Sequence, residues 1–348
     1  MAARSRSNAP VLSERALNRA LLDRQLLLAR EKTSIVDVVE QVGGLQAQYA
    51  PSSYVGLWSR VEGFVRDDLT AALEDRSLVQ GSLMRTTIHV VSRREYWLYV
   101  MGIKRARQEW AKRVRALPPE RQLPDGVRRV RELLADGPKT VKELGDDARG
   151  FLGTLSFYVD LVRVPPTGTW ERRRADRLAL AEDWVGPNDA TEAAGLEHLV
   201  RSYLRAFGPA AWADIASWAG ISGLDARRGG ETLALVWYRD EQGRELIDLG
   251  DAPVPNPDVG APVRFLPHWD ANLLVHARRS GVLPEPHRPR VFSTKTPFSI
   301  GTYLVDGRVA GGWSYGDGRI QLDPFERLAP ADEAAVEKER AALEQFVR

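Results

Sequence analysis

The strongest constraint on the fold is a pattern of elements that occurs three times along the chain. Each copy combines a helix, a tight turn, one or two further helices and a pair of β-prone segments. Gly-Pro stands at the equivalent turn of the second and third copies, at Gly137-Pro138 and Gly208-Pro209. This order of elements is typical of a winged helix-turn-helix. The sequence therefore predicts a helix-rich α+β protein built from three tandem winged-helix units.

Changes in composition set the predicted domain boundaries. Pro118-Pro119 breaks the chain after the first unit, and a proline-rich stretch from Ala252 follows the third. Beyond it β-signals dominate, and Asp306-Gly307 predicts the turn of a hairpin. The expected units are 12–117, 118–187 and 188–251 for the three winged helices, then 252–348 for a β-rich subdomain that ends in a helix over 331–347.

Helix start and stop signals are clearest in the first unit. Ser13 precedes one amphipathic pattern, Ser34 with Asp37 has capping-box spacing, and Gly43-Gly44 ends that second helix. The other helices of this unit are expected over 52–61, 67–73 and 93–117, and its wing strands over 78–83 and 85–91. The second unit is expected to have helices over 127–134, 141–144 and 152–161 and strands over 161–164 and 178–181. The third is expected to have helices over 191–207, 212–218 and 224–233 and strands over 235–239 and 245–249.

Composition excludes several classes of function. Among 348 residues there is no cysteine, which rules out disulfides, thiolate catalysis and cysteine-ligated metal centres. The five histidines form no close pair, so neither a metal nor another cofactor is expected. No apolar run is long enough to span a bilayer, and residues 1–10 have the pattern of a flexible tail rather than a signal peptide, which predicts a cytoplasmic protein. The net charge of +2 does not by itself indicate a polyanionic partner.

Two amide side chains flank a small residue in Leu45-Gln46-Ala47-Gln48. In extended backbone Gln46 and Gln48 project to the same side, whereas in a helix they diverge. Gly43-Gly44 and Pro51 bracket the segment and favour extended backbone. The two amides can then converge on one water molecule or one base edge. Spacing alone leaves open a pair of solvated glutamines.

Three predicted positions carry basic residues that could contact DNA. Arg172, Arg173 and Arg174 lie at the tip of the second wing, where winged helices commonly contact phosphates. Arg85, Thr87 and His89 alternate along a predicted strand of the first wing and would face DNA together, although packing of His89 inside the sheet is an equal alternative. A third set lies on the helix predicted after the first wing, and its residues either face solvent or contact DNA: Lys104, Arg105, Arg107, Lys112, Arg113 and Arg115.

Five motifs in order give the chain a family resemblance. They are the Gln46-Ala47-Gln48 segment, residues 83–89 (LMRTTIH), 205–210 (RAFGPA), 270–274 (DANLL) and 304–313 (LVDGRVAGGW). Together they resemble the AlkZ-like DNA glycosylases of a winged-helix superfamily, over roughly residues 12 to 347. One departure is Asp270-Ala271-Asn272, where relatives have the two polar residues adjacent.

The resemblance implies a C-shaped arrangement of three winged helices around a channel for double-stranded DNA. It implies that Gln46 and Gln48 position the water that hydrolyses the glycosidic bond of an N7-alkylated purine. The implied lesions are bulky adducts or interstrand crosslinks, and the implied purpose is DNA repair or self-resistance to a genotoxin. Asp270, Asn272 and Trp313 become candidates for a substrate pocket, although a capping role for Asp270 and a plain hairpin for Trp313 explain them equally well. Arg308 on the Asp-Gly hairpin becomes a candidate DNA contact. A monomer associated with the nucleoid is expected.

The implied chemistry is consistent with these residue types. Alkylation at N7 places a positive charge on the purine, so the leaving group is activated and an oriented water is the main requirement. No lysine lies in the motif, which favours direct hydrolysis over a Schiff-base mechanism. The alternative is a non-catalytic winged-helix DNA-binding protein or transcription regulator. Three tandem units, which are unlike a dimer that reads two half-sites, and a glutamine pair outside any recognition helix argue against a regulator.

Overall fold

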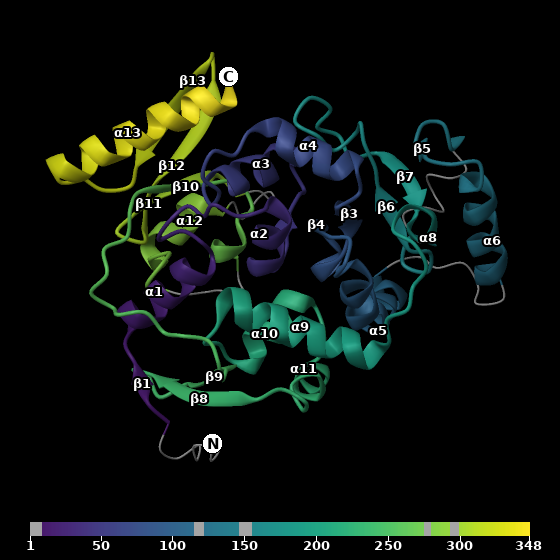
Figure 1. Ribbon diagram of the computed structural model, residues 1–348, viewed down its shortest axis with the longest axis horizontal. Coiled ribbons are helices and arrows are strands. Elements are labelled where there is room, and N and C mark those ends of the chain that lie inside the picture. The colour runs from purple at the N-terminus through teal and green to yellow at the C-terminus, as the bar shows by residue number, and fades with distance from the viewer. Residues whose placement is uncertain (1–8, 115–121, 146–154, 275–279, 293–298) are drawn as a thin grey trace.

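The computed structural model describes residues 9–114, 122–145, 155–274, 280–292 and 299–348. In Figure 1 the C-terminal sheet and helix lie at the upper left, the third predicted unit lies along the bottom, and the second lies at the right. The described chain is α+β, with three β-sheets surrounded by helices. Residues 1–8 of the predicted N-terminal tail and 152–154 of the helix predicted over 152–161 lie outside the described residues. The helix prediction is wrong for residues 156–160, which form turns and a bend before β6 begins at Leu161.

The first unit begins as its capping residues predict. Ser13 caps α1 (Glu14–Arg24) by accepting from the backbone N–H of Ala16, and Ser34 caps α2 (Ile35–Gln41) by accepting from that of Asp37. Gly43 and Gly44 follow α2 with positive φ angles of 76° and 84°. The remaining elements of this unit are β2 (Leu45–Gln46), α3 (Ala50–Trp58), α4 (Arg66–Glu74), β3 (Leu78–Ser82), β4 (Ile88–Ser92) and α5 (Tyr96–Val114).

A six-stranded sheet joins the first and second predicted units. Its order is β2-β4-β3-β6-β7-β5, in which β5 is Lys139–Thr140, β6 is Leu161–Arg163 and β7 is Arg177–Leu180. The junction is the antiparallel pair of β3 with β6, where Gly81 lies opposite Val162. The two predicted wings are therefore parts of one sheet. On its outer side lie α6 (Leu123–Leu134) and α8 (Ala181–Trp184), whereas residues 141–144, expected to be a helix, form turns in which Thr140 and Glu143 cap each other.

The connection between β3 and β4 differs from the prediction. Residues 85–91 were expected to form one strand, but Met84–Thr86 is a short 3-10 turn and β4 begins at Ile88. Arg85 and Thr86 have positive φ angles of 52° and 61°, which reverse the chain direction there. Arg85, Thr87 and His89 therefore do not alternate along one strand, and the prediction that they share one face is wrong.

The third unit packs on the first through two helices. It consists of α9 (Glu192–Phe207), α10 (Trp212–Ala219), α11 (Gly223–Gly229) and the hairpin β8 (Leu235–Asp240) and β9 (Glu245–Leu249), close to the predicted bounds. A β-carbon on Gly195 of α9 would lie 2.3 Å from the backbone nitrogen of Gly102 of α5, so only glycines permit this close approach of two helices. A short strand β1 (Val11–Leu12) pairs in parallel with β8.

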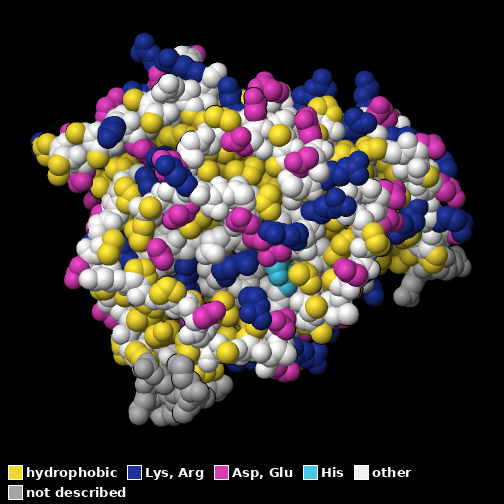
Figure 2. Space-filling view, in the orientation of Figure 1, with side chains coloured by type: hydrophobic (Ala, Val, Ile, Leu, Met, Phe, Trp, Pro, Cys, Tyr) yellow, Lys and Arg dark blue, Asp and Glu magenta, His cyan; other side chains and the backbone are white. Residues whose placement is uncertain are grey.

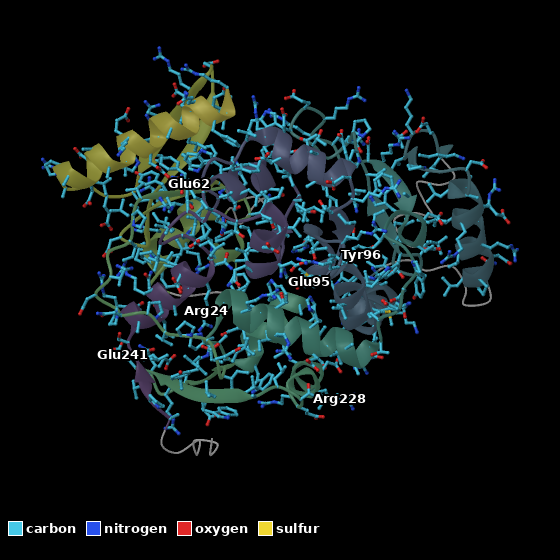
Figure 3. The ribbon with its side chains drawn as sticks, viewed as in Figure 1. Arg24, Glu62, Glu95, Tyr96, Arg228 and Glu241 are labelled. Carbon is cyan, nitrogen blue, oxygen red and sulfur yellow. The ribbon has the colours of Figure 1, made fainter. Side chains whose placement is uncertain are left out.

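A buried ion pair ties the N-terminal helix to this third unit. Both guanidinium nitrogens of Arg24 at the end of α1 bind the carboxylate of Asp248 on β9, at 2.8 and 2.7 Å. The Arg24 and Asp248 side chains are 6% and 0% exposed. Figure 3 shows Arg24 where α1 approaches α9.

The C-terminal part forms the expected β-rich layer. An antiparallel sheet runs in the order β10 (Arg264–Leu266), β11 (Gly301–Val305), β12 (Arg308–Gly316) and β13 (Arg319–Pro324). Asp306 and Gly307 form the predicted hairpin turn with φ angles of 43° and 77°. Helix α13 (Pro330–Val347) packs against this sheet, and three short helical segments complete the layer: η4 (Ala271–Leu273), η6 (Glu285–His287) and α12 (Arg288–Val291).

Three apolar cores hold these layers together. The largest joins α5, α9 and α10 to β3 and the turn after it, with Tyr99, Leu199 and Trp218 fully or almost fully buried. A second lies between α2 to α4 and the C-terminal sheet, and a smaller third lies under α6. None of the helices in the described part of the chain is both long and apolar enough to cross a lipid bilayer.

Candidate functional site around Gln46 and Gln48

The glutamine segment follows Gly43-Gly44 and enters the six-stranded sheet as β2, its edge strand. Gln46 lies opposite His89 of β4, and the backbone N–H of Ala47 donates to the carbonyl of Ile88 at 2.7 Å. The chain then bends at Gln48 and Tyr49 before α3 begins. The extended backbone predicted from the flanking glycines is therefore confirmed for Leu45–Gln46. Gln46 is 9% exposed, whereas Gln48 lies at the surface.

The carbonyl oxygens of both glutamine side chains are held by the same short connection, residues 85–88. Oε1 of Gln46 accepts from Nη2 of Arg85 at 3.1 Å, and Oε1 of Gln48 accepts from the backbone N–H of Ile88 at 2.8 Å. Each of these oxygens keeps a second lone pair, and neither Nε2 atom has a hydrogen-bond partner within the described residues. The two amides thus have a fixed orientation and retained capacity for further hydrogen bonds.

The neighbouring residues of this connection do not form the predicted DNA-contacting row. His89 is 3% exposed, and its Nδ1 atom lies 3.0 Å from the carbonyl oxygen of Thr87. Burial, and secondarily the charge of Arg85, lower the pKa of His89 to about 3. The Thr87 hydroxyl donates to the carbonyl of Met84 at 3.0 Å. The predicted DNA contact of His89 is therefore corrected to a neutral histidine inside the sheet, the alternative that the sequence left open.

Asp270 and Gln46 line one small cavity. This cavity has a volume of about 20 Å³, and Arg60 and His268 also line it. The carboxylate of Asp270 accepts from Nη2 of Arg60 at 3.1 Å, and both side chains are almost fully buried. Its other oxygen accepts from the backbone N–H of Asn272 at 3.0 Å, so that Asp270 caps η4. The expected capping role is therefore present, together with a buried ion pair that no local sequence signal indicates.

Two of the three candidates for a substrate pocket belong to the core. Asn272 is 1% exposed and donates from Nδ2 to Asp270 and to Gln25 at 2.8 and 3.3 Å. Trp313 is 7% exposed, donates from Nε1 to the carbonyl of Leu266 at 2.9 Å and packs on Phe265. Nδ2 of Asn272 and Nε1 of Trp313 thus bind the protein itself, whereas the buried Oδ1 of Asn272 has no hydrogen-bond partner within the described residues. The assignment of these two residues to a substrate pocket stays a prediction.

The hairpin that carries Arg308 is anchored on α1. Asp306 in its turn accepts hydrogen bonds from Arg15 at 2.9 Å and, at shorter range, from Arg19. Gly307 allows the turn to approach closely, since a β-carbon there would lie 2.6 Å from the Asn18 side chain. Arg308 itself is exposed. It remains a predicted DNA contact.

The predicted wing tip lies next to the glutamine segment. Arg172, Arg173 and Arg174 are exposed in the loop between β6 and β7. Nη1 of Arg173 donates to the phenolic oxygen of Tyr49 at 2.9 Å, and the guanidinium lies 5.8 Å from the centres of the Tyr49 and Trp170 rings. Tyr49 also packs edge-on against His268. Sequence reasoning missed Tyr49, for which adjacency to Gln48 was the only local signal.

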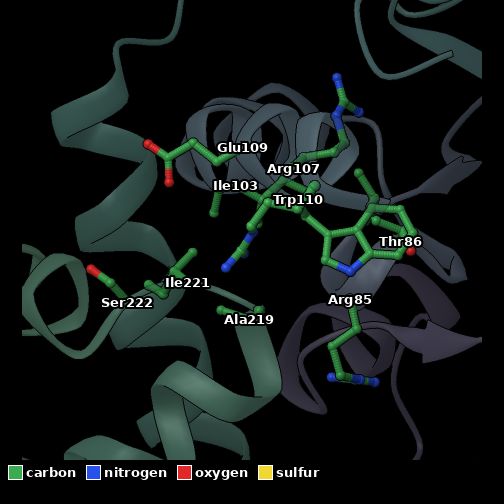
Figure 4. Close-up of a pocket in the computed structure, with 13 residues that line it drawn as sticks. Arg85, Thr86, Ile103, Arg107, Glu109, Trp110, Ala219, Ile221 and Ser222 are labelled. Carbon is green, nitrogen blue, oxygen red and sulfur yellow. The ribbon is translucent and has the colours of Figure 1, made fainter. Parts of the chain in front are cut away.

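A larger pocket opens on the other side of the 84–86 turn. Its volume is about 480 Å³, and it lies between that turn, α5 and the connection from α10 to α11. Ile103, Trp110, Arg113 and Ile221 are among the residues that line it. Arg85 also lines this pocket, and Figure 4 shows that its side chain extends away from Trp110 and Ile221. The turn is thus a partition between the pocket and Gln46.

Charge on the surface is mixed rather than uniformly basic. Figure 2 shows Lys and Arg side chains interspersed with acidic ones, with several basic side chains across the middle of this face. On α5, Arg105 and Arg107 bind the carboxylates of Asp225 and Asp160, which reduces their availability to DNA. The described residues contain no group of three His, Asp or Glu side chains placed to hold a metal ion.

Known proteins are similar to this chain in sequence and in structure. A family model described as "DNA glycosylase AlkZ-like" matches residues 39–346. A protein of Streptomyces sahachiroi named "Interstrand DNA cross-link repair glycosylase" is 24% identical over 353 residues, which cover 92% of each chain. The solved structure of the Streptomyces sahachiroi DNA glycosylase AlkZ is similar with a TM-score of 0.80, over 97% of each chain at 21% identity. These matches do not favour the alternative of a non-catalytic regulator.

Proposed function

Since the chain belongs to the AlkZ-like DNA glycosylase family, we propose that it hydrolyses the N-glycosidic bond of N7-alkylated purines in double-stranded DNA. Gln46 and Gln48 position the attacking water. The observation that supports this role is that both amide oxygens are fixed by the 85–88 connection while each keeps capacity for another hydrogen bond. A pair of merely solvated glutamines would not need two such anchors.

The chemistry needs few groups from the protein. The second lone pairs of the two Oε1 atoms accept the hydrogens of one water, so that its oxygen lone pair faces C1′ of the lesion nucleotide. The new bond forms between that oxygen and C1′, and the bond from C1′ to N9 of the purine breaks. N9 takes the electron pair, which neutralises the cationic purine as it leaves, and the proton from water passes to solvent. Because the leaving group is already activated, neutral amides suffice and no cofactor takes part.

Contacts with DNA come from exposed arginines near these amides. Arg172 and Arg174 are exposed beside Arg173, which reaches the residue after Gln48. We assign phosphate contacts to this loop and to Arg308, since guanidinium groups bind phosphate oxygens well. The relative from Streptomyces sahachiroi is named for interstrand crosslinks. Bulky N7 adducts and crosslinks are therefore the proposed lesions, acted on by a monomer at the nucleoid in repair or genotoxin self-resistance.

Single-turnover kinetics on a duplex with one N7-methylguanine test the proposal. Gln46→Ala and Gln48→Ala each lower the rate of abasic-site formation by about 10² to 10³-fold, while the Kd for DNA changes little. Gln321→Ala, on exposed strand β13, is the matched control and keeps the wild-type rate. Wild-type rates in both glutamine variants would overturn the assignment. A second duplex with an N7-linked interstrand crosslink tests the lesion class by gel separation of the unhooked strands.

A further inference from the structure

We propose that Arg85 is a positioning residue that fixes the amide orientation of Gln46, and that it is not a phosphate contact. This inference rests on the proposed function, because it assigns to Arg85 an effect exerted through Gln46. The sequence pattern had suggested that Arg85 faces DNA. Three observations indicate a different role. They are the contacts of its guanidinium, the neutral groups that surround its charge, and the backbone conformation at Arg85.

The guanidinium of Arg85 bridges two elements. Nη2 donates to Oε1 of Gln46 at 3.1 Å, and Nη1 donates to the carbonyl oxygen of Trp218 in the last turn of α10. The last carbonyls of a helix lack partners within the helix and carry its partial negative charge, so a guanidinium is a favourable group there. One arm of the fork is therefore anchored on α10, and the other arm holds Gln46.

This contact selects one of the two orientations of the Gln46 amide. A guanidinium has only hydrogen-bond donors, so it can bind the Oε1 atom but not the Nε2 atom of a glutamine. A half-turn of the amide would bring two donors together and lose the 3.1 Å bond. Arg85 thereby determines where the second lone pair of Oε1 lies. That lone pair is the acceptor that the proposed mechanism requires for water.

The charge of Arg85 has no acidic partner in the described part of the chain. Its guanidinium binds only the carbonyl oxygens of Gln46 and Trp218. Burial lowers the pKa of Arg85 to about 10, a value at which it still carries its charge at neutral pH. A partly buried cation held by neutral dipoles rather than by a carboxylate is costly, which indicates a function for the charge or for the fork. The two carbonyls orient the fork between Gln46 and the end of α10.

The backbone at Arg85 is itself held in an unusual conformation. Arg85 and the next residue, Thr86, both have positive φ angles, 52° and 61°. Two consecutive non-glycine residues of this kind are strained, and such strain concentrates at functional sites. Gly220 packs against the turn, since a β-carbon there would lie 3.2 Å from the backbone nitrogen of Arg85. The turn is thus fixed from the α10 side, and it aims the side chain at Gln46.

A double-mutant cycle tests the coupling between Arg85 and Gln46. In Arg85→Met the single-turnover rate at saturating DNA falls by about 10²-fold, because misplacement of a catalytic group costs about that much. The Kd for DNA and its dependence on salt stay at wild-type values. In the Gln46→Ala background, Arg85→Met causes no further loss of rate, because the group through which it acts is gone. Arg85→Lys, which cannot reproduce the fork, recovers only part of the rate.

The matched control is Arg163→Met. Arg163 on β6 is also a largely buried arginine whose pKa is lowered by burial, but it donates to the Ser82 hydroxyl and not to either glutamine. Its substitution lowers the thermal stability without lowering the rate. If Arg85 only stabilises the packing on α10, Arg85→Met will also lower the thermal stability without lowering the rate. That result would overturn the proposal. If Arg85→Met fails to fold, Arg85→Lys and its double mutant with Gln46→Ala replace it in the cycle.

Two further outcomes separate this inference from the proposed function. A weaker Kd in Arg85→Met, with a salt slope reduced by about one and an unchanged rate, would make Arg85 a phosphate contact and overturn the positioning role. Equal losses of rate in the presence and absence of Gln46 would overturn it as well. A wild-type rate in Gln46→Ala would instead contradict the function proposed for Gln46 itself.

Discussion

Arg173 donates a hydrogen bond of 2.9 Å from Nη1 to the phenolic oxygen of Tyr49. The two residues lie 124 positions apart in the sequence, yet the contact connects the loop between β6 and β7 to the residue directly after Gln48. Trp170 supports the same guanidinium with its ring. A loop that is proposed to bind phosphate thus also contacts the segment that is proposed to carry catalysis. DNA bound by one would be placed close to the other.

Arg173→Ala is expected to lower the rate as well as the affinity. The hydrogen bond to Tyr49 contributes about 1 kcal/mol to holding the Gln48 segment in its position, and its loss corresponds to roughly a fivefold lower single-turnover rate. Arg174 has a side chain that is 84% exposed and pairs, among the described residues, with Asp176; its substitution should affect affinity alone. Titrations at several salt concentrations and rates at saturating DNA measure both effects. Identical behaviour of Arg173→Ala and Arg174→Ala would show that the Tyr49 contact has no catalytic consequence.

Much of the secondary structure could be predicted because its signals are local. Ser13 and Ser34 each cap the helix that the sequence placed after them, and the helix predicted from Thr191 begins one residue later with Thr191 as its cap. Asp306-Gly307 forms the expected hairpin turn. The pairing of β3 with β6 had no such signal, because it joins segments about eighty residues apart whose partners depend on the tertiary fold. The parallel pairing of β1 with β8 is of the same kind.

Sequence reasoning predicted the parts of the candidate site that depend on a single continuous segment, and it missed the parts that depend on contacts between distant segments. The glycines before Gln46 indicated extended backbone, and the structure has it. Alternation suggested a strand through Arg85, but two non-glycine residues with positive φ angles broke it, and no residue type there signals such a turn. The ion pair of Arg60 with Asp270 is a contact across 210 positions, which spacing arguments cannot find.

The rate is expected to be independent of pH near neutrality, while the stability is not. Gln46 and Gln48 do not titrate, and the pKa of His89 is lowered to about 3, so His89 stays neutral in the folded protein. Unfolding restores a pKa near 6.5, so the unfolded chain binds a proton that the folded one does not as the pH falls below 6.5. His89 therefore lowers the stability progressively between pH 6.5 and about 3.

His89→Gln should remove this contribution. Its melting temperature is expected to fall less steeply than that of the wild type as the pH is lowered through about 6 to 4. Thermal unfolding followed by circular dichroism over this range compares the two proteins. Parallel curves would contradict a neutral buried histidine, and a bell-shaped rate profile centred near pH 6.5 would contradict a mechanism without a titrating base.

Asp248→Ala is expected to destabilise the fold by about 3–5 kcal/mol, because it leaves the buried Arg24 guanidinium without its carboxylate. Urea denaturation measures the loss as a lower midpoint. The control is Arg94→Ala, which removes ion pairs of a side chain that is 66% exposed and should lower the midpoint much less, because exposed ion pairs are screened by solvent. Equal midpoints for the two variants would mean that the Arg24–Asp248 pair does not stabilise the packing of α1 on β9.

Asp270→Asn separates two roles for a carboxylate that lines the same cavity as Gln46. Because Asp270 already balances the charge of Arg60, we expect a structural role: the variant loses about 3–5 kcal/mol of stability but keeps its single-turnover rate within about twofold at low temperature. Arg60→Met together with Asp270→Asn should recover much of that stability, because no unpaired charge is then buried. A carboxylate that stabilises a cationic sugar predicts the opposite pattern, with a rate about 10² to 10³-fold lower in both variants. Rates measured on folded protein, with stability measured separately by urea denaturation, distinguish the two roles.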